Sequence, residues 1–368
     1  MDSIKILLVI IGSSLEIILG LIYFFLIRIF FNIDIVGYYG TIISFFATLA
    51  FITDLGFSIA HLKYFPEAKN SEEEAKYNGT LLFFKLIQFL MFVVINLTLI
   101  PIIPLYTDDI RVMYLILLST TFILTAHFFQ PLFYSKKEVF KYTISIISSS
   151  IIRVLLLFIA ITFFAKDIWL LGYVLLISNV SFFMINLFLL RKTKIQKPPL
   201  NYIKKYFNYA LPFFITTSLI VIVTNIDVLF LGAWFPVDDV ANYYTAKQFY
   251  AYVFIFINGV SNILVTTFSK NVSIDENDEN LSIIQQVHKF LNLAVIPIVM
   301  IIMVYLTDYF VFIFGENYRL TGVVLSIMSL TLISISVNIA NNSQLKALGK
   351  VKFLAAITIF ENILTIDH

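Results

Sequence analysis

The chain of 368 residues is 60% hydrophobic and only 13% charged, carries a formal net charge of +2 and contains no cysteine. A soluble domain of this length cannot bury so large an apolar fraction, so the composition indicates a membrane protein. The lack of cysteine excludes disulfides, thiolate metal sites and a cysteine nucleophile. The small net charge gives no indication of nucleic-acid binding.

Long apolar segments follow one another along the chain, each of roughly 20 to 27 residues, which is enough to cross a bilayer as a helix. They predict an all-α, polytopic membrane protein with about 10 to 11 transmembrane helices. The first segment follows Lys5 directly, without a small-residue cleavage site, which favours a retained helix. The predicted spans are Ile6–Phe31, Gly37–Ala60, Leu81–Pro104, Met113–Tyr134, Thr143–Ala165, Ile168–Leu190, Ala210–Phe235, Asn242–Phe268, Phe290–Phe314 and Thr321–Ala340, followed by the shorter Phe353–Ile366.

Lysine and arginine are concentrated at the N-terminus and in alternate loops. The N-terminus and the segments 63–76, 136–141, 191–205, 270–289 and 346–352 hold 18 of these residues, whereas the intervening loops hold only 3. By the positive-inside rule, this bias predicts a multi-pass protein whose N-terminus is cytoplasmic.

An internal repeat divides the chain. A shift of 204 residues places DIVGYYGT, starting at Asp34, over DDVANYYT, starting at Asp238. Because six helices are an even number, both halves enter the membrane from the same side and the repeat is parallel. We therefore predict two six-helix bundles, at 1–195 and 210–368, joined by a cytoplasmic linker at 196–209, with the second bundle incomplete and the chain truncated. Alternatively, the last short segment is an interfacial or re-entrant piece of a naturally shorter protein.

Two ionisable residues are predicted near mid-membrane, where a charge costs at least a few kcal/mol and indicates function. Glu16 and Arg153 each lie about 10 residues, or roughly 15 Å, into their helices. We expect them to face one cavity and to pair, with Glu16 a candidate proton or cation site. The alternative is a buried ion pair that only fixes helix packing. Lys85 and Asp54 lie nearer to helix ends, where side chains can snorkel to water.

A second polar cluster is predicted in the outer third of the membrane. It comprises Arg28 on the first span, Asp227 on the seventh, and Lys247 with Gln248 on the eighth. A guanidinium and an ammonium at similar depth suit an anionic ligand such as a phosphate group. The alternative is that Arg28 and Lys247 anchor the helices to lipid headgroups at the interface.

Four stretches resemble motifs of one known family. They are DLGFSIAHLKYFPE from Asp54, NIDVLFLG from Asn225, VANYYTAKQF from Val240 and LKALGKVKF from Leu345. In this order they resemble the polysaccharide biosynthesis membrane proteins, which are lipid-linked oligosaccharide flippases of the multidrug/oligosaccharidyl-lipid/polysaccharide exporter superfamily. The resemblance implies two six-helix bundles around a cavity lined by the first, second, seventh and eighth helices. The chain departs from the family by its early end and, in a minor way, by the run Ala241, Asn242, Tyr243 in the eighth-helix motif, where a Gly-Ile-Tyr-like run is common.

The resemblance implies a flippase that carries a polyprenyl-diphosphate-linked oligosaccharide to the outer leaflet of the plasma membrane for a surface polysaccharide. Arg28 and Lys247 would bind the diphosphate, with Asp227, Gln248 and Arg153 as further substrate-binding residues. Membrane lipids, a glycan polymerase and glycosyltransferases are the implied partners. The sequence predicts no enzyme activity, cofactor, metal or nucleic-acid partner. The alternatives are a cation-coupled exporter of drugs or organic cations from the same superfamily, and a membrane glycan polymerase or ligase.

Overall fold

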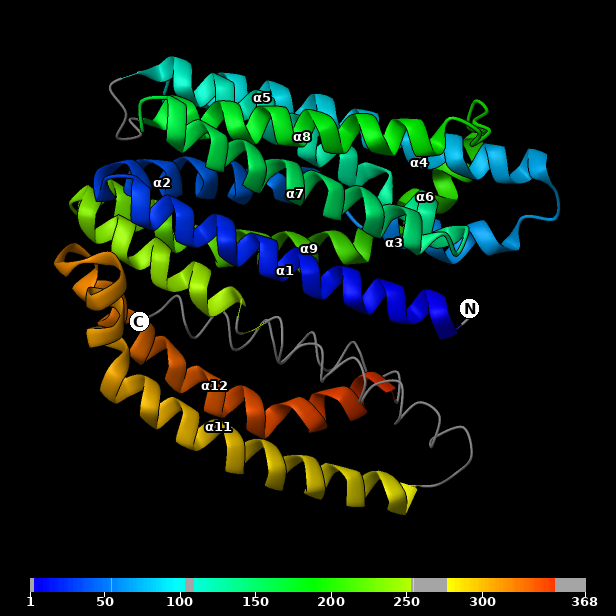
Figure 1. Cartoon of the computed structure of the whole chain (residues 1–368). Helices are drawn as coiled ribbons and strands as arrows, with labels where there is room; N and C mark the ends of the chain where they lie inside the picture. The colour runs from blue at the N-terminus through cyan, green and yellow to red at the C-terminus, as the bar shows by residue number, and fades with distance from the viewer. Residues whose placement is uncertain (1–2, 54, 103–108, 253, 255–276, 348–368) are drawn as a thin grey trace. The chain divides into compact units, whose positions relative to one another are not determined.

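The computed structural model describes residues 3–53, 55–102, 109–252, 254 and 277–347, and within these ranges every regular element is a helix (Figure 1). Its contacts divide the chain into two compact units, 1–237 and 238–368, which are described separately below. The all-helical prediction is confirmed. The predicted bundle boundaries at 195 and 210 stay a prediction.

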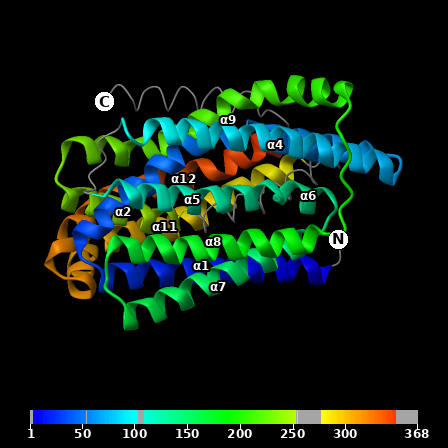
Figure 2. The same cartoon turned by 90° about the horizontal axis from the view of Figure 1, so that it is seen from above.

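The first unit is a bundle of long helices connected by short breaks. Its helices are α1 (Ser3–Phe30), α2 (Ile33–Leu49), α3 (Phe57–Tyr64), α4 (Ser71–Leu99), α5 (Ile110–Phe128), α6 (Gln130–Ser135), α7 (Val139–Phe163), α8 (Ile168–Leu190) and α9 (Leu200–Trp234). The most extensive packing joins α5 to α8, α1 and α8 to α7, and α2 to α9. Figure 2 shows α7 and α8 running side by side in the turned view.

Short polar residues begin several of these helices. Asn70 accepts hydrogen bonds from the backbone N–H groups of Glu72 and Glu73 at the start of α4. Asp167 accepts one from Leu170 N in the same way at the start of α8. Such caps satisfy the first N–H groups of a helix, which have no partner within the helix.

The second predicted span, Gly37–Ala60, is not one continuous helix. After α2, the chain forms a 3-10 turn at Ala50–Thr53 and starts again as α3 after Gly56. Gly56 has a left-handed φ of +85°, and a Cβ there would lie 2.9 Å from the carbonyl oxygen of Ala210. Hydropathy alone misses this break because an average over a long apolar window is little changed by the short stretch 53–56.

The fourth predicted span, Met113–Tyr134, also divides into two helices. Helix α5 ends at Phe128, and α6 starts at Gln130 with Pro131 in its first turn. Proline has no backbone N–H and clashes with the preceding turn, so it is tolerated at a helix start but not in its interior. The predicted linker, 196–209, is helical from Leu200 onward as the first part of α9, a helix of 35 residues and about 52 Å.

The second unit contains helical residues 238–252, α11 (Asn277–Phe314), the 3-10 turn η3 (Glu316–Tyr318) and α12 (Arg319–Ala347). Helices α11 and α12 pack closely: a Cβ at Gly322 would lie only 2.4 Å from Thr307 Cα, so the absence of a side chain at Gly322 permits this approach. Pro297 lies inside α11, as neighbouring helices permit in membrane proteins. The segment Phe353–Ile366, on which the prediction of an incomplete bundle rests, lies outside the described residues.

Five helical stretches among the described residues are long and apolar enough to span a membrane. They are Ile33–Thr53, Ser71–Leu99, Ile110–Ser135, Val139–Phe163 and Ile168–Leu190. Many of their large apolar side chains are exposed, including Leu86, Val94 and Phe158. Hydrocarbon is the solvent in which such a surface is stable, so the protein is a multi-pass membrane protein.

Candidate substrate-binding site

Arg28 lies in the last turn of α1 and is almost fully buried, with only 3% of its surface exposed. Its Nη1 donates a hydrogen bond to Phe24 O at 3.4 Å, and its guanidinium lies 4.1 Å from the centre of the Phe24 ring. A cation at a helix C-terminus is stabilised by the helix dipole. A buried charge of this kind is costly. The role of Arg28 in substrate binding stays a prediction.

Arg153 lies on α7 and makes its hydrogen bonds to α8. Its Nε donates to Ser178 Oγ at 3.2 Å, and its Nη2 donates to Asn179 Oδ1 at 2.8 Å. Asn179 in turn donates to the backbone oxygen and the hydroxyl of Ser119 on α5, at 3.1 and 2.9 Å. The network therefore joins three helices through one half-buried guanidinium.

Glu16 lies on α1, the helix that packs against α7, and its side chain is exposed. Among the described residues, the structure records no hydrogen bond or ion pair within 4 Å between Glu16 and Arg153. Arg153 is bonded to Ser178 and Asn179 instead. The predicted pairing of Glu16 with Arg153 therefore has no direct contact in this structure, while the proposed role of Glu16 as an ion site stays a prediction.

The remaining predicted site residues lie on two elements. Asp227 is half-buried on α9, and its carboxylate accepts a hydrogen bond from Val228 N at 2.8 Å. Lys247 and Gln248 are half-buried neighbours on the helical stretch 238–252, where Gln248 Nε2 donates to the Tyr244 hydroxyl at 2.8 Å. Arg28 and Asp227 belong to the first unit and the other two to the second. The joint site formed by all four stays a prediction.

Lys85, predicted from its position near a helix end to snorkel to water, is a buried cation. Only 3% of it is exposed, and its Nζ donates a hydrogen bond to Thr53 O at 2.8 Å, at the break before α3. Gln88, in the amide orientation that satisfies both groups, donates to the same oxygen at 3.2 Å and accepts from Leu55 N at 2.9 Å. The snorkelling interpretation of Lys85 is therefore wrong. Its ammonium supports a helix break that hydropathy had not indicated.

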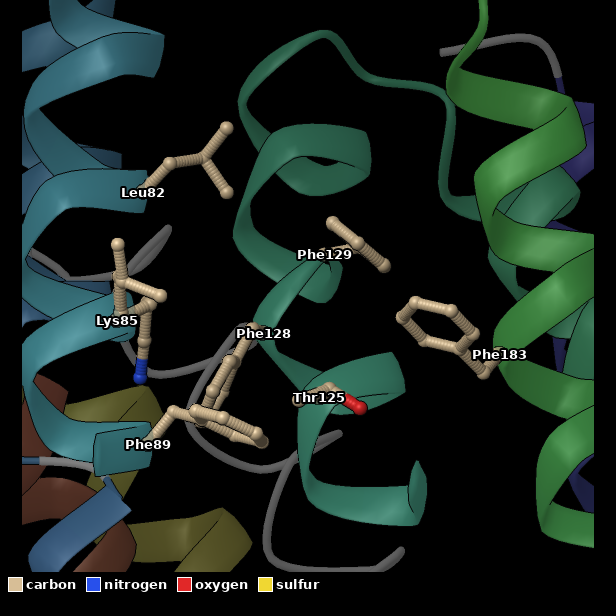
Figure 3. A pocket seen from close by; sticks show the side chains of 8 residues that line it. Leu82, Lys85, Phe89, Thr125, Phe128, Phe129 and Phe183 are labelled. Atoms are coloured by element: carbon tan, nitrogen blue, oxygen red, sulfur yellow. The ribbon is translucent and has the colours of Figure 1, made fainter. Parts of the chain in front are cut away.

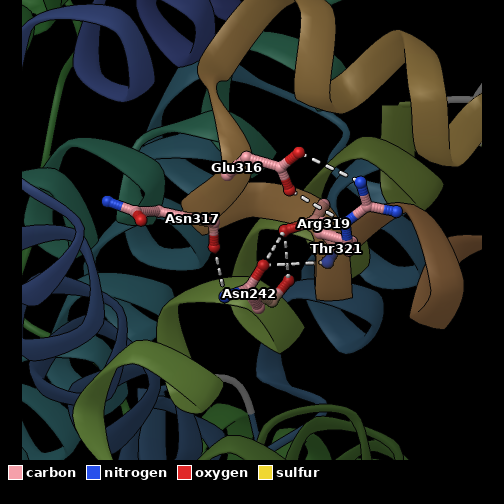
Figure 4. Close-up of polar contacts among 5 residues, drawn as sticks. All are labelled: Asn242, Glu316, Asn317, Arg319 and Thr321. Atoms are coloured by element: carbon pink, nitrogen blue, oxygen red, sulfur yellow. Dashed lines mark hydrogen bonds and ion pairs between the residues drawn. The ribbon is translucent and has the colours of Figure 1, made fainter.

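Asn242, noted above as a departure from the family motif, forms a buried network in the second unit (Figure 4). Its Nδ2 donates to Asn317 O at 2.9 Å, and its Oδ1 accepts from both the backbone N and the hydroxyl of Thr321 at 2.8 Å. These bonds fix the connection between α11 and α12. Next to them, exposed Glu316 pairs with Arg319 at 2.8 Å, which holds the pKa of the Glu316 carboxyl below its usual value.

Two family models match the chain. The polysaccharide biosynthesis protein family matches residues 4–272, and the MatE family matches residues 212–366. No curated protein matches.

Solved structures of similar fold cover almost the whole chain. An inward-facing multidrug resistance MATE family transporter of the MOP superfamily has a TM-score of 0.73 and 14% identity, covering 97% of this chain and 88% of its own. The lipid II flippase MurJ, in an inward closed conformation, has a TM-score of 0.73 and 16% identity, covering 93% and 76%. A MOP superfamily transporter from Pyrococcus furiosus has a TM-score of 0.60 and 13% identity, covering 97% and 84%. At these identities the likeness shows a shared fold.

Proposed function

From the premise that this chain belongs to the polysaccharide biosynthesis protein family, we propose that it moves a polyprenyl-diphosphate-linked oligosaccharide to the outer leaflet of the cell membrane. The glycan would serve a surface polysaccharide such as a lipopolysaccharide, an O-antigen or a capsule. The protein has the fold of the MOP superfamily transporters and flippases. Its chemistry would be binding and conformational exchange, with no covalent bond made or broken.

The observation that supports this substrate best is the buried guanidinium of Arg28. A diphosphate offers several anionic oxygens, and a guanidinium can hold two of them through parallel N–H bonds. Burial strengthens these bonds because the local dielectric constant is lower than that of water. Lys247 would add a point charge, and Gln248 and Asp227 would contact the polar part of the same ligand.

Transport requires that the substrate bind with different affinity to the inward-facing and outward-facing states, because a ligand shifts an equilibrium only by that difference. Glu16 would also shift the equilibrium between these two states, by taking up a proton or a cation. Its exposed carboxylate on α1 is compatible with access to ions. Arg153 would hold α7 against α8 in every state, or release Asn179 to contact substrate in one of them.

An exporter of organic cations is the second candidate function, and the carboxylates of Glu16 and Asp227 favour it. A cationic drug would seek these groups, whereas Arg28 and Lys247 would repel it. The fold likeness to a multidrug resistance transporter leaves this alternative open to experiment. The two candidates therefore differ in which sign of charge carries the substrate.

The test measures flipping of a fluorescent lipid-linked oligosaccharide in proteoliposomes, read out by its accessibility to a reagent outside the vesicle. Arg28→Ala and Lys247→Ala each remove a charge-assisted hydrogen bond worth about 1.5 kcal/mol or more. The double variant should therefore flip about 100-fold more slowly. The matched control is Arg111→Ala, which removes an exposed arginine paired with Asp109.

Three results distinguish the candidates. Loss of flipping in the double variant with normal insertion and a normal Arg111→Ala control supports the proposal. Normal flipping by the double variant contradicts the assignment of Arg28 and Lys247. Uptake of a fluorescent organic cation that depends on Glu16 and Asp227, without any flipping, establishes the cation exporter instead.

A further inference from the structure

A cavity of about 380 Å³ lies where α5 breaks into α6, with α4 on one side and α8 on the other (Figure 3). Phe128 and Thr125 reach it from α5, Phe89 from α4 and Phe183 from α8. These helices carry none of the predicted substrate-binding residues. The cavity is therefore lined by residues other than the predicted substrate-binding ones.

The helix break explains why there is space at this position. Phe129 N donates to Ala126 O, and Leu132 N donates to Phe129 O, which are hydrogen bonds between residues three apart. One helix therefore ends and the next begins within a single turn, with Pro131 in the first turn of α6. Helices α4 and α8, on either side of this break, are continuous (Figure 3). A broken helix between two longer neighbours leaves a gap that side chains fill only in part.

The walls of the cavity offer no free polar group to a ligand. The hydroxyl of Thr125 donates to Thr121 O at 2.9 Å, and the ammonium of Lys85 donates to Thr53 O at 2.8 Å. The rest of the surface is aromatic or aliphatic. A buried water needs two to four polar partners, so neither water nor a polar solute is stabilised here.

The mouth of the cavity lies within a lipid-facing surface. Leu86 at the rim is 57% exposed, and it starts a stripe along α4 that continues through Leu90 and Val94 at helical spacing. Phe183 lies seven residues before the end of α8, which is about 10 Å along the helix axis. The cavity thus opens into hydrocarbon, in the leaflet next to the basic loops 136–141 and 191–197.

We propose that this cavity binds one acyl chain of a membrane phospholipid. Its size is within the range of small-molecule sites, of roughly 300 to 1,000 Å³, and its lining matches an alkyl chain in polarity. The bound chain contacts the ring of Phe128, which lies 5.1 Å from the Lys85 ammonium. Lipid bound here therefore packs next to Lys85, whose ammonium bonds to Thr53 O at the break between α2 and α3.

The experiment uses a phospholipid with a photoactivatable diazirine in its acyl chain, reconstituted with the full chain in proteoliposomes. Mass spectrometry of the labelled peptides compares Phe89 and Phe183, in the cavity, with Val94, on the open stripe. We expect cavity labelling to persist after the vesicles are diluted with unlabelled lipid, while labelling at Val94 falls with the dilution. Thr125→Phe fills the cavity and should lower its labelling about tenfold without affecting Val94.

The control for adding a phenyl ring is Thr162→Phe at an exposed position of α7, which should leave all labelling unchanged. Leu82→Phe provides a second filling variant if Thr125→Phe does not fold. The proposal is overturned if cavity and stripe lose label in parallel, or if neither filling variant changes the cavity labelling. Displacement by polyprenyl phosphate but not by phospholipid would assign the cavity to the substrate tail and would overturn the acyl-chain assignment.

Discussion

In the first copy of the repeat, Gly37 of α2 lies so close to the chain just after α9 that a Cβ there would be 2.4 Å from the carbonyl oxygen of Val237, three residues past the end of that helix. In the second copy the equivalent residue is Ala241, and the next residue, Asn242, bonds to the connection between α11 and α12. The first copy is held by close backbone packing, whereas the second is held by buried hydrogen bonds. Two similar sequences thus stabilise their helices through different interactions.

The difference shows what a repeat in sequence does and does not determine. Both copies begin a helix and both bury a threonine, Thr41 and Thr245. Two neighbouring positions before these threonines differ between the copies: Gly37 corresponds to Ala241, and Tyr38 corresponds to Asn242. Glycine is needed where a backbone approaches, and an amide is needed where a turn presents both an N–H group and a carbonyl oxygen.

The largest effect is expected from Gly37→Leu, which tests whether packing alone fixes the first copy. The new side chain would clash with backbone that cannot move aside, and overpacking of this kind costs about 3 kcal/mol or more. Thermal unfolding in detergent should show a strong loss of stability. Asp34→Ala, at an exposed position of the same helix, serves as the control and should unfold like the parent protein.

Asn242→Leu should have a smaller but clear effect on the second copy. It leaves the N–H group of Thr321 and the carbonyl oxygen of Asn317 without their buried partner, at a cost of about 2 kcal/mol. Asn317→Ala is the matched control, because only its backbone oxygen takes part in the network. Equal stability of Asn242→Leu and the parent protein would refute the hydrogen-bonded description of this copy.

Thr41→Val tests whether a hydrogen bond contributes to the stability of the first copy. The Thr41 hydroxyl donates to Gly37 O at 3.0 Å within α2, and valine preserves the shape that meets Gly232. We expect a change below about 1 kcal/mol in the free energy of unfolding, since a backbone oxygen inside a helix keeps its helical partner. A loss as large as that of Asn242→Leu would show that hydrogen bonds matter equally in both copies.

Arg319→Ala should have the smallest effect. The guanidinium lowers the pKa of Glu316 below its usual value, so the ion pair persists above the lowered pKa and is lost as the pH falls through it. The substitution should raise the pKa of Glu316 toward its usual value, which an NMR titration of labelled glutamate can measure. Because the pair is exposed, the unfolding temperature at pH 7 should not change measurably. An unchanged pKa in the variant would exclude the pair as the cause of the shift.

Hydropathy predicted the extent of some helices closely and their interruptions poorly, and α4 and α9 each begin ten residues before the predicted span. The predicted span Ile168–Leu190 coincides with α8, and Thr143–Ala165 differs from α7 by only a few residues at each end. The breaks at Gly56 and before Pro131 depend on single backbone positions. An average over a long apolar window does not register them.

The site residues show a similar limit. Depth along a helix follows from the sequence number, and it placed Glu16 and Arg153 at a common level. The direction in which a side chain points around its helix depends on how the helices pack. The sequence gives no such information for Glu16 and Arg153, so their pairing could not be predicted from depth alone. The polar neighbours Ser178 and Asn179, adjacent within an apolar span, were the available signal for the partner of Arg153.

Helix α9 has a mechanical consequence. Its length of about 52 Å exceeds the roughly 30 Å of the hydrocarbon layer, and its first turns are tied to the first unit by a hydrogen bond between Tyr206 and His61 and an ion pair between Lys205 and Glu67. Most of the predicted linker is thus part of a continuous helix whose first turns are bonded to the rest of the first unit. We expect a bend or tilt at one end of α9 to reach the other end, and glycine substitutions in the middle of the helix to weaken this coupling while both ends stay folded.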